Sequence, residues 1–196
     1  MTFRHYTHWI FDMDGTLTEP VHDFDLIRAE IGIPQGVPIL EAIARMTPDK
    51  AMAARRKLDQ IETDLANRAR PQPGIRLLLE NLTGKGRKLA ILTRNGERIG
   101  HLTLKAAGLD GFFDDEAVIG RETCAPKPDP AGVNHLLAMW NASRDTTLIV
   151  GDYLYDLKAG FDAGITTVHF DSTEAYSWPE YTHYRIARMD QLLTMA

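Results

Sequence analysis

Two aspartates, Asp12 and Asp14, stand at the end of a short apolar and aromatic run near the start of the chain. Two positions apart, they would share one face of an extended strand, but a turn begun by Gly15 can aim both at one ligand. Carboxylates that converge in this way suit metal binding and proton transfer. A lone pair of such acids most often only ends a strand and caps a turn. The flanking Gly15 and Thr16 favour the chemical role.

Three further polar residues stand at comparable positions along the chain. Thr93 ends the apolar run KLAIL, Asp152 follows TLIVG, and Lys127 stands just before the segment PDPAGVNHLLAMW. In a parallel sheet, ligands bind outside the carboxyl ends of the strands. We therefore expect these side chains to converge on one rim of a sheet together with the two aspartates.

Four short segments carry a resemblance to a known family. DMDGT, LTRN, KPDP and GDYLYD, in this order, resemble the four signatures of the haloacid dehalogenase superfamily of phosphohydrolases. Each segment alone is a weak signal, but four in order at successive strand ends make a specific combination. The closest resemblance is to the subfamily I type with a short helical cap, of which the phosphoglycolate phosphatases are examples. The resemblance implies a phosphatase.

The resemblance also implies a role for each residue. Asp12 would be the nucleophile that forms an aspartyl-phosphate, and Asp14 would protonate the leaving alkoxide and later activate water. One acid must stay ionised while its neighbour carries a proton, so their environments should differ. Thr93 and Asn95 would mark the binding site for the non-transferred phosphate oxygens. Lys127 would set a fixed positive charge against the phosphoryl group and Asp12.

A magnesium site follows from the same resemblance. The side chain of Asp12, the backbone carbonyl of Asp14 and the side chain of Asp152 would be its protein ligands, and Asp156 would support them through water. Such an all-oxygen set with open positions suits Mg²⁺, and Cys124 is not expected to bind the metal. For Asp156 alone, the ordinary alternative is the capping of a helix.

Apolar runs that alternate with helical patterns predict the fold. Short connections between such runs favour an α/β, Rossmann-like parallel sheet with helices on both faces. The predicted strands cover residues 8–13, 88–95, 117–120, 147–153 and 166–171. The predicted helices cover residues 75–86, 97–107, 128–140, 154–164 and 189–196.

The segment 19–70 has a different character, because it is rich in helix formers and reads as wholly helical. Pro48 can start its last helix, and the prolines from Pro71 onward end it. We therefore predict a phosphatase core made of residues 1–18 and 71–196, with a small α-helical cap over residues 19–70 inserted after the first strand.

A cap of this kind excludes water and binds the non-reacting part of a substrate, which favours small phosphorylated metabolites. Phosphoglycolate and sugar phosphates are candidates through the resemblance alone. Charged residues on amphipathic helices usually face solvent. Arg94, which lies outside the cap, is also expected to face solvent. None of the seven histidines is assigned to catalysis. The polar cap residues that could reach a substrate are His22, Arg28, Arg45 and Lys50.

Composition narrows the partners and the compartment. The formal charge of −5 over 196 residues provides no general basic surface, which argues against nucleic acid and anionic membranes as partners. No run approaches the ~20 apolar residues of a membrane span, and no signal-like region precedes Asp12. Cys124 is the single cysteine, as a reducing cytoplasm permits, so we expect a cytoplasmic protein. The sequence does not indicate an oligomeric state.

Three other functions are compatible with parts of this pattern. A sugar-phosphate mutase of the same superfamily would use the same aspartyl-phosphate and return the group to sugar. A dehalogenase would attack carbon, but it would need neither Asp14 nor Asp152. A non-catalytic binding protein could keep the fold, since fold alone does not imply activity. The complete set of signature residues argues against this last alternative.

Overall fold

The computed structural model describes residues 3–195, and these contain a six-stranded parallel sheet in the order β3-β2-β1-β4-β5-β6. The predicted Rossmann-like sheet is therefore confirmed. The sequence did not predict β6, because its three residues are mostly half-buried or exposed and form no apolar run. The strands are β1 (His8–Phe11), β2 (Lys88–Leu92), β3 (Val118–Ile119), β4 (Thr147–Gly151), β5 (Thr166–Phe170) and β6 (Tyr184–Ile186).

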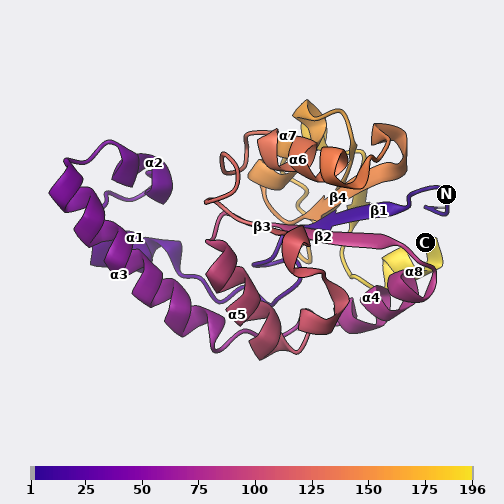
Figure 1. Cartoon of the computed structure of the whole chain (residues 1–196), viewed down its shortest axis with the longest axis horizontal. Helices are drawn as coiled ribbons and strands as arrows, with labels where there is room; N and C mark the ends of the chain where they lie inside the picture. The colour runs from indigo at the N-terminus through magenta and orange to yellow at the C-terminus, as the bar shows by residue number, and fades with distance from the viewer. Residues whose placement is uncertain (1–2, 196) are drawn as a thin grey trace.

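Helices cover both faces of this sheet (Figure 1). Side chains alternate between the faces along each strand, so Trp9 and Phe11 join one core while Ile10 joins the other. The helices on the first face are α4 (Ile75–Gly84), α5 (Glu97–Ala107) and α8 (Gln191–Met195). Those on the second face are α6 (Ala131–Trp140) and α7 (Leu154–Asp162). Single-turn 3₁₀ helices occupy Asp110–Phe112, Asp115–Ala117, Arg144–Thr146 and Pro179–Tyr181.

Several predicted boundaries were wrong near the carboxyl ends of the strands. The strands predicted over 8–13, 88–95 and 147–153 stop at Phe11, Leu92 and Gly151. The polar residues that follow lie in loops, although the Asp12 amide still donates to the Val150 carbonyl and the Thr93 amide to the Ile119 carbonyl, both at 2.9 Å.

The helix predicted to begin at Pro128 begins at Ala131 instead. Residues before it form a turn, in which the Asp129 amide donates to the Pro126 carbonyl at 3.2 Å. The Asp129 carboxylate then accepts from the Ala131 amide at 2.8 Å. The residue before a proline disfavours helical backbone, so Asp129 before Pro130 delays the start of the helix.

Three helices lie between β1 and α4 and extend away from the sheet (Figure 1). They are α1 (Phe24–Ile31), α2 (Ile39–Ala44) and α3 (Pro48–Ala66). The start at Pro48 was predicted, but the segment is not wholly helical, because turns and extended backbone separate and flank the helices. Gly32, with φ of 79°, ends α1 in the left-handed region. These helices share their own apolar core, made by Ile27, Ile33, Ile43, Ala51, Ala54 and Leu58.

The chain enters and leaves this helical insertion through two neighbouring connections. The Glu19 amide donates to the Arg70 carbonyl, and the Gln72 amide donates to the Leu17 carbonyl, both at 2.9 Å. Farther along, α3 also packs against α5. The division of the chain into a core and a cap stays a prediction, and its outermost residues, 1, 2 and 196, lie outside the described part.

Within residues 3–195, every helix is too short or too polar to cross a lipid bilayer.

Candidate active site

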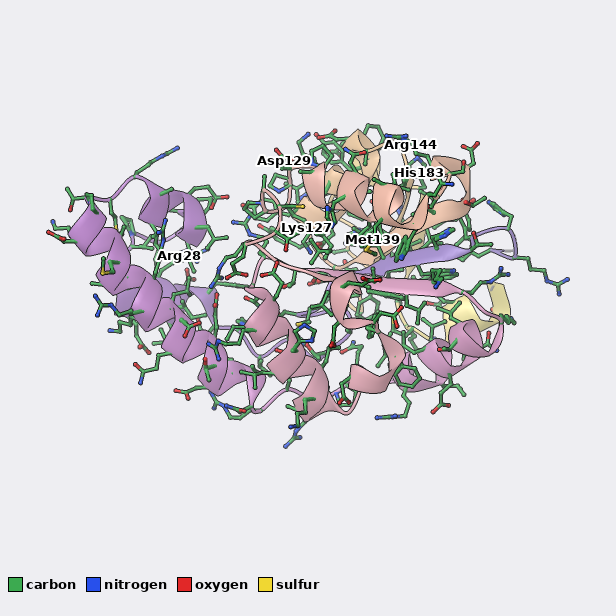
Figure 2. The ribbon with its side chains drawn as sticks, in the orientation of Figure 1. Arg28, Lys127, Asp129, Met139, Arg144 and His183 are labelled. Atoms are coloured by element: carbon green, nitrogen blue, oxygen red, sulfur yellow. The ribbon has the colours of Figure 1, made fainter. Side chains whose placement is uncertain are left out.

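The loops after β1, β2 and β4 meet at one edge of the sheet, at the side that faces the helical insertion. There they border a cleft of about 280 Å³. Figure 2 shows Lys127 at this edge and Arg28 among the helices of the insertion. The structure brings all the predicted site residues into this cleft, namely Asp12, Asp14, Thr93, Asn95, Lys127, Asp152 and Asp156.

Lys127 is the centre of the charge arrangement. Its Nζ donates to Oδ1 of Asp12 and to Oδ1 of Asp156, at 2.5 Å in each case. The lysine side chain is only 2% exposed. Burial alone would lower the pKa of Lys127, but the two carboxylates outweigh burial and raise the pKa. The ammonium charge is therefore held in place inside the protein.

Asp156 has two partners that fix its position in the first turn of α7. Its Oδ1 accepts from Lys127, and its Oδ2 accepts from the Tyr153 amide at 3.1 Å. The carboxylate thus caps the helix and also holds Lys127. This close approach requires glycine at position 151, where an added Cβ would lie 2.2 Å from the Asp156 Cβ.

Asp152 packs against the turn that follows Asp12 and Asp14. Its Oδ1 accepts from the Thr16 hydroxyl at 3.0 Å. Gly15 has a φ of +92°, and a Cβ at this residue would lie 2.5 Å from the Asp152 Oδ2. Both conditions exclude a side chain at position 15. Burial, followed by the charges of Asp12 and Asp156, raises the pKa of Asp152 to about 8.

These acids fit a divalent cation. Asp12, Asp152 and Asp156 each place a carboxylate oxygen within 4.8 Å of the others. Burial and the neighbouring carboxylates raise the pKa values of Asp152 and Asp156, and a cation would remove the repulsion between the carboxylates. Both oxygens of Asp156 already accept hydrogen bonds, so Asp12 and Asp152 are the better direct ligands. The all-oxygen donors suit a hard ion.

Asp14 lies between the sheet and the insertion. Its Oδ2 accepts from Nδ2 of Asn95 at 2.7 Å, and its Oδ1 lies 3.7 Å from Nδ1 of His22. Burial raises the pKa of Asp14, although His22 and Asn95 oppose the rise. The backbone N–H of Asn95 also donates to the Thr93 hydroxyl at 3.1 Å. The Asn95 side chain therefore contacts Asp14, the predicted general acid. The sequence had predicted only a role for Asn95 in binding phosphate oxygens.

Sequence reasoning missed Arg121 in this cleft, and it named His22 only as a cap residue that could reach a substrate. His22 reaches Asp14 from a loop before α1, and no spacing in the sequence marks this approach. Arg121 lines the cleft and donates to both carboxylate oxygens of Glu62 on α3, at 2.7 and 2.8 Å. The sequence does not indicate that Glu62, a buried residue of an amphipathic helix, pairs with Arg121. Both contacts depend on how the insertion sits on the sheet.

The expectation that Arg94 faces solvent was wrong. Its Nη2 donates to both oxygens of Glu41 on α2, at 3.0 Å. Its Nη1 donates to the Lys127 carbonyl, and its guanidinium lies 4.6 Å from the centre of the Tyr155 ring. Arg94 therefore joins the insertion to the sheet at the side of the cleft.

The four polar candidates of the insertion divide into two pairs. His22 and Arg28 line the cleft. Arg45 and Lys50 are exposed and lie outside the lining. His22 and Arg28 lie just before and within α1, whereas Arg45 follows α2 and Lys50 lies in the first turn of α3.

The amino-acid sequence is similar to those of known hydrolases. The model of the haloacid dehalogenase-like hydrolase family matches residues 25–170. A haloacid dehalogenase-like hydrolase domain-containing protein of Arabidopsis thaliana is 30% identical over 190 residues, which are 88% of this chain and 74% of that protein. A phosphoglycolate phosphatase of Aquifex aeolicus is 29% identical over 175 residues, 81% of each chain.

Solved structures show the same fold. A hydrolase from Pseudomonas syringae matches with a TM-score of 0.78 and 23% identity, over 96% of this chain and 98% of that one. A protein described as a predicted phosphoglycolate phosphatase from Haemophilus somnus matches with a TM-score of 0.74 and 21% identity, over 97% of each chain.

Proposed function

This chain belongs to the haloacid dehalogenase-like hydrolases, and we propose that it is a magnesium-dependent phosphatase of small phosphomonoesters that works through an aspartyl-phosphate on Asp12. One observation carries the proposal. Asp12 is buried against the fixed charge of Lys127, and a second acid, Asp14, borders the same cleft. Relatives named phosphoglycolate phosphatase and pyrophosphatase support phosphate ester or anhydride chemistry.

The reaction proceeds in two displacements. First, a carboxylate oxygen of Asp12 attacks phosphorus, the ester P–O bond breaks, and Asp14 gives its proton to the leaving alkoxide. Second, a water oxygen attacks the same phosphorus while Asp14 takes the proton of that water. The bond from phosphorus to Asp12 breaks, which releases inorganic phosphate and restores both carboxyl groups.

The environments of the two acids support this division of work. Nζ of Lys127 lies 2.5 Å from Oδ1 of Asp12 and places a fixed positive charge beside the nucleophile. Burial raises the pKa of Asp14, so this acid holds a proton at a higher pH than an exposed aspartate does. Asn95 donates to one Asp14 oxygen and orients the group.

The remaining residues bind the phosphoryl group and the metal. The Thr93 hydroxyl and a neighbouring backbone amide bind phosphoryl oxygens, and Lys127 balances their charge. Asp12, Asp152 and the Asp14 carbonyl would hold Mg²⁺, while Asp156 holds Lys127 in position. When bound, the ion neutralises charge on the phosphoryl oxygens.

Residues 19–70 act as a cap over the core made of residues 1–18 and 71–196. The paired connections near Glu19 and Arg70 support this division. A cap excludes water from the reacting group and selects small substrates. A single cysteine, Cys124, suits a reducing compartment such as the cytoplasm.

The two enzymatic alternatives have less support. A dehalogenase, which attacks carbon, would not need Asp14 or Asp152. Both residues nevertheless border the cleft together with Asp12. A mutase would share the site, and product analysis separates the two: a phosphatase releases free phosphate, whereas a mutase gives an isomeric sugar phosphate.

The test is the variant Asp12→Asn, which removes the nucleophile and keeps the shape of the side chain. We expect phosphate release from small phosphomonoesters to fall by at least about a thousandfold, and chelation of Mg²⁺ to abolish it in the unchanged protein. The control is Asp64→Asn, the same chemical change on the exposed side of α3. Near-normal release by Asp12→Asn contradicts the proposal, provided that Asp64→Asn behaves like the unchanged protein.

A further inference from the structure

The cleft has two ends of different chemistry. Carboxylates and Lys127 come from the strand ends, whereas the wall provided by the insertion is mostly apolar. Two aromatic residues at this wall remain exposed to solvent: Phe24 is 54% and Tyr153 is 49% exposed. The apolar wall is formed by Phe24, Ile27, Ile39, Leu40 and Leu58 of the insertion, with Tyr153 of the core opposite.

The arginines near this wall already have acidic partners. Arg94 binds both oxygens of Glu41 at 3.0 Å, and Arg121 binds both oxygens of Glu62 at 2.7 and 2.8 Å. Arg28 donates to Asp25 at 2.7 Å, and its Nε donates to a backbone carbonyl of the loop before α2. None of these guanidinium groups is left to balance a new charge.

The other two lining bases differ, because Lys127 is paired whereas Nδ1 of His22 is buried without a hydrogen-bond partner among the described residues. Lys127 contacts two carboxylates, and Nδ1 of His22 lies 3.7 Å from Asp14. Within the described part of the chain, every lysine and arginine that lines the cleft therefore has a carboxylate partner. An anion outside the phosphoryl position would have to displace one of these carboxylates or lie beside it, and both arrangements cost free energy next to partly buried ion pairs.

We propose that this phosphatase selects phosphomonoesters whose alcohol is uncharged and apolar, and that it discriminates against esters with a second anionic group. The apolar alcohol covers Phe24 and Tyr153 and removes their exposed surface from water. The cleft of about 280 Å³ restricts the alcohol to a small body, of the size of one aromatic ring. This inference rests on the proposed function and names the substrate class of the same site.

The inference sets this chain apart from some of its relatives. Several are named phosphoglycolate phosphatase, and phosphoglycolate carries a carboxylate beside its phosphate. The cleft described above provides no unpaired lysine or arginine for that carboxylate among residues 3–195.

The first experiment compares kcat/KM of the unchanged protein for benzyl phosphate, phosphoglycolate and the primary amide of phosphoglycolate. All three are esters of alkyl alcohols, and the last two differ by one charge. We expect benzyl phosphate and the amide to exceed phosphoglycolate at least tenfold. Equal or better turnover of phosphoglycolate overturns the inference and leaves the phosphatase function intact. If none of the three releases phosphate in an Asp12-dependent way, the proposed function fails, and the inference fails with it.

A second experiment changes the charge beside the wall. Glu41→Gln removes the partner of Arg94, while the Lys127 carbonyl and the Tyr155 ring still hold the guanidinium at the cleft. We expect the ratio of kcat/KM for phosphoglycolate to that for benzyl phosphate to rise at least fivefold. Glu30→Gln, on the exposed side of α1, removes the same charge away from the cleft and should leave the ratio unchanged. An unchanged ratio in Glu41→Gln overturns the inference.

A third experiment changes the apolar wall. Phe24→Ala should raise KM for benzyl phosphate at least fivefold and leave KM for phosphoglycolate within twofold. Leu26→Ala is the control, because Leu26 is an exposed apolar residue of the same helix outside the cleft lining. Equal effects of Phe24→Ala on both substrates would show that the wall does not contact the alcohol, against the inference.

Discussion

At Asp152 and its neighbours, three carboxylates share a single ammonium group. Lys127 neutralises only part of the charge of Asp12, Asp152 and Asp156. Burial and the neighbouring carboxylates raise the pKa of Asp152 to about 8 and that of Asp156 to about 6, from an ordinary value of 3.8. The folded, metal-free protein therefore binds protons that the unfolded chain releases.

The stability of the metal-free protein should consequently depend on pH. Between about pH 4 and pH 8 these two carboxyl groups hold more protons in the folded state than in the unfolded state, so their contribution to the free energy of unfolding falls as the pH rises. Each extra proton lowers stability by at most about 1.4 kcal/mol per pH unit. The raised pKa of Lys127 adds no slope here, because its contribution is complete below its ordinary value of 10.5. We expect the melting temperature in chelator to fall from pH 5 to pH 8.

Excess Mg²⁺ should remove most of this fall, since the ion replaces the bound protons. Asp152→Asn should reduce both the fall and the effect of Mg²⁺, whereas Asp64→Asn should keep both. A melting temperature in chelator that stays level or rises over this range would rule out the charge arrangement described here.

Among the elements, α7 shows how close packing positions a carboxylate. Gly160 of this helix lies against β4 and β5, and a Cβ there would be 2.3 Å from Cγ2 of Ile149 and 2.9 Å from Cγ2 of Thr167. Both neighbours are β-branched and cannot turn away easily. Because Asp156 is in the first turn of the same helix, a shift of α7 also moves the partner of Lys127.

Gly160→Ala should therefore destabilise the protein by about 1–3 kcal/mol and reduce activity. Gly84→Ala makes the same change at the end of α4, where nothing lies within 4 Å of the added carbon. This control should be neutral or more stable by up to about 1 kcal/mol, as alanine suits a helix better than glycine. Urea unfolding of both variants measures the difference. Equal stabilities would mean that α7 has room to adjust.

The sequence predicted those elements whose residues repeat a clear pattern. The apolar runs of β1, β4 and β5 and the helix Glu97–Ala107 were recognised, because local periodicity defines them. The short β6 was not, since it depends on pairing with β5 instead of a run of its own. The same limit applies to the site. Asp12 and Asp152 follow strands that the sequence predicts, whereas the approach of His22 to Asp14 and the pairing of Arg121 with Glu62 depend on contacts of the insertion, which no local pattern encodes.

For the whole molecule, the main question is how independent the helical insertion is from the sheet. The insertion has its own apolar core, and the sheet has two others. The connections at Leu17, Glu19, Arg70 and Gln72 are hydrogen-bonded to one another. The sheet should therefore fold without the insertion, although the loss of contacts between α3 and α5 exposes one side of α5.

We predict that a chain in which Asn-Gly replaces residues 20–69 folds cooperatively and still gains thermal stability from Mg²⁺. Glu19 and Arg70 are already paired, so a two-residue turn can join them. This shortened chain should lose the discrimination between benzyl phosphate and phosphoglycolate. Circular dichroism and thermal unfolding check the first part, and kcat/KM the second. A chain without a cooperative transition would show that the insertion is part of the folding unit.

The central place of β1 in the sheet has a consequence for synthesis on the ribosome. Its neighbours are β2, which begins at Lys88, and β4, which begins at Thr147. The strand is therefore synthesised early, and its edge toward β4 stays unpaired until most of the chain has emerged, whereas the helices of the insertion form from local contacts in the meantime. Nascent chains that stall shortly before Thr147 should present β1 with one unpaired edge and aggregate, so slow translation of the second half should lower the yield of folded enzyme.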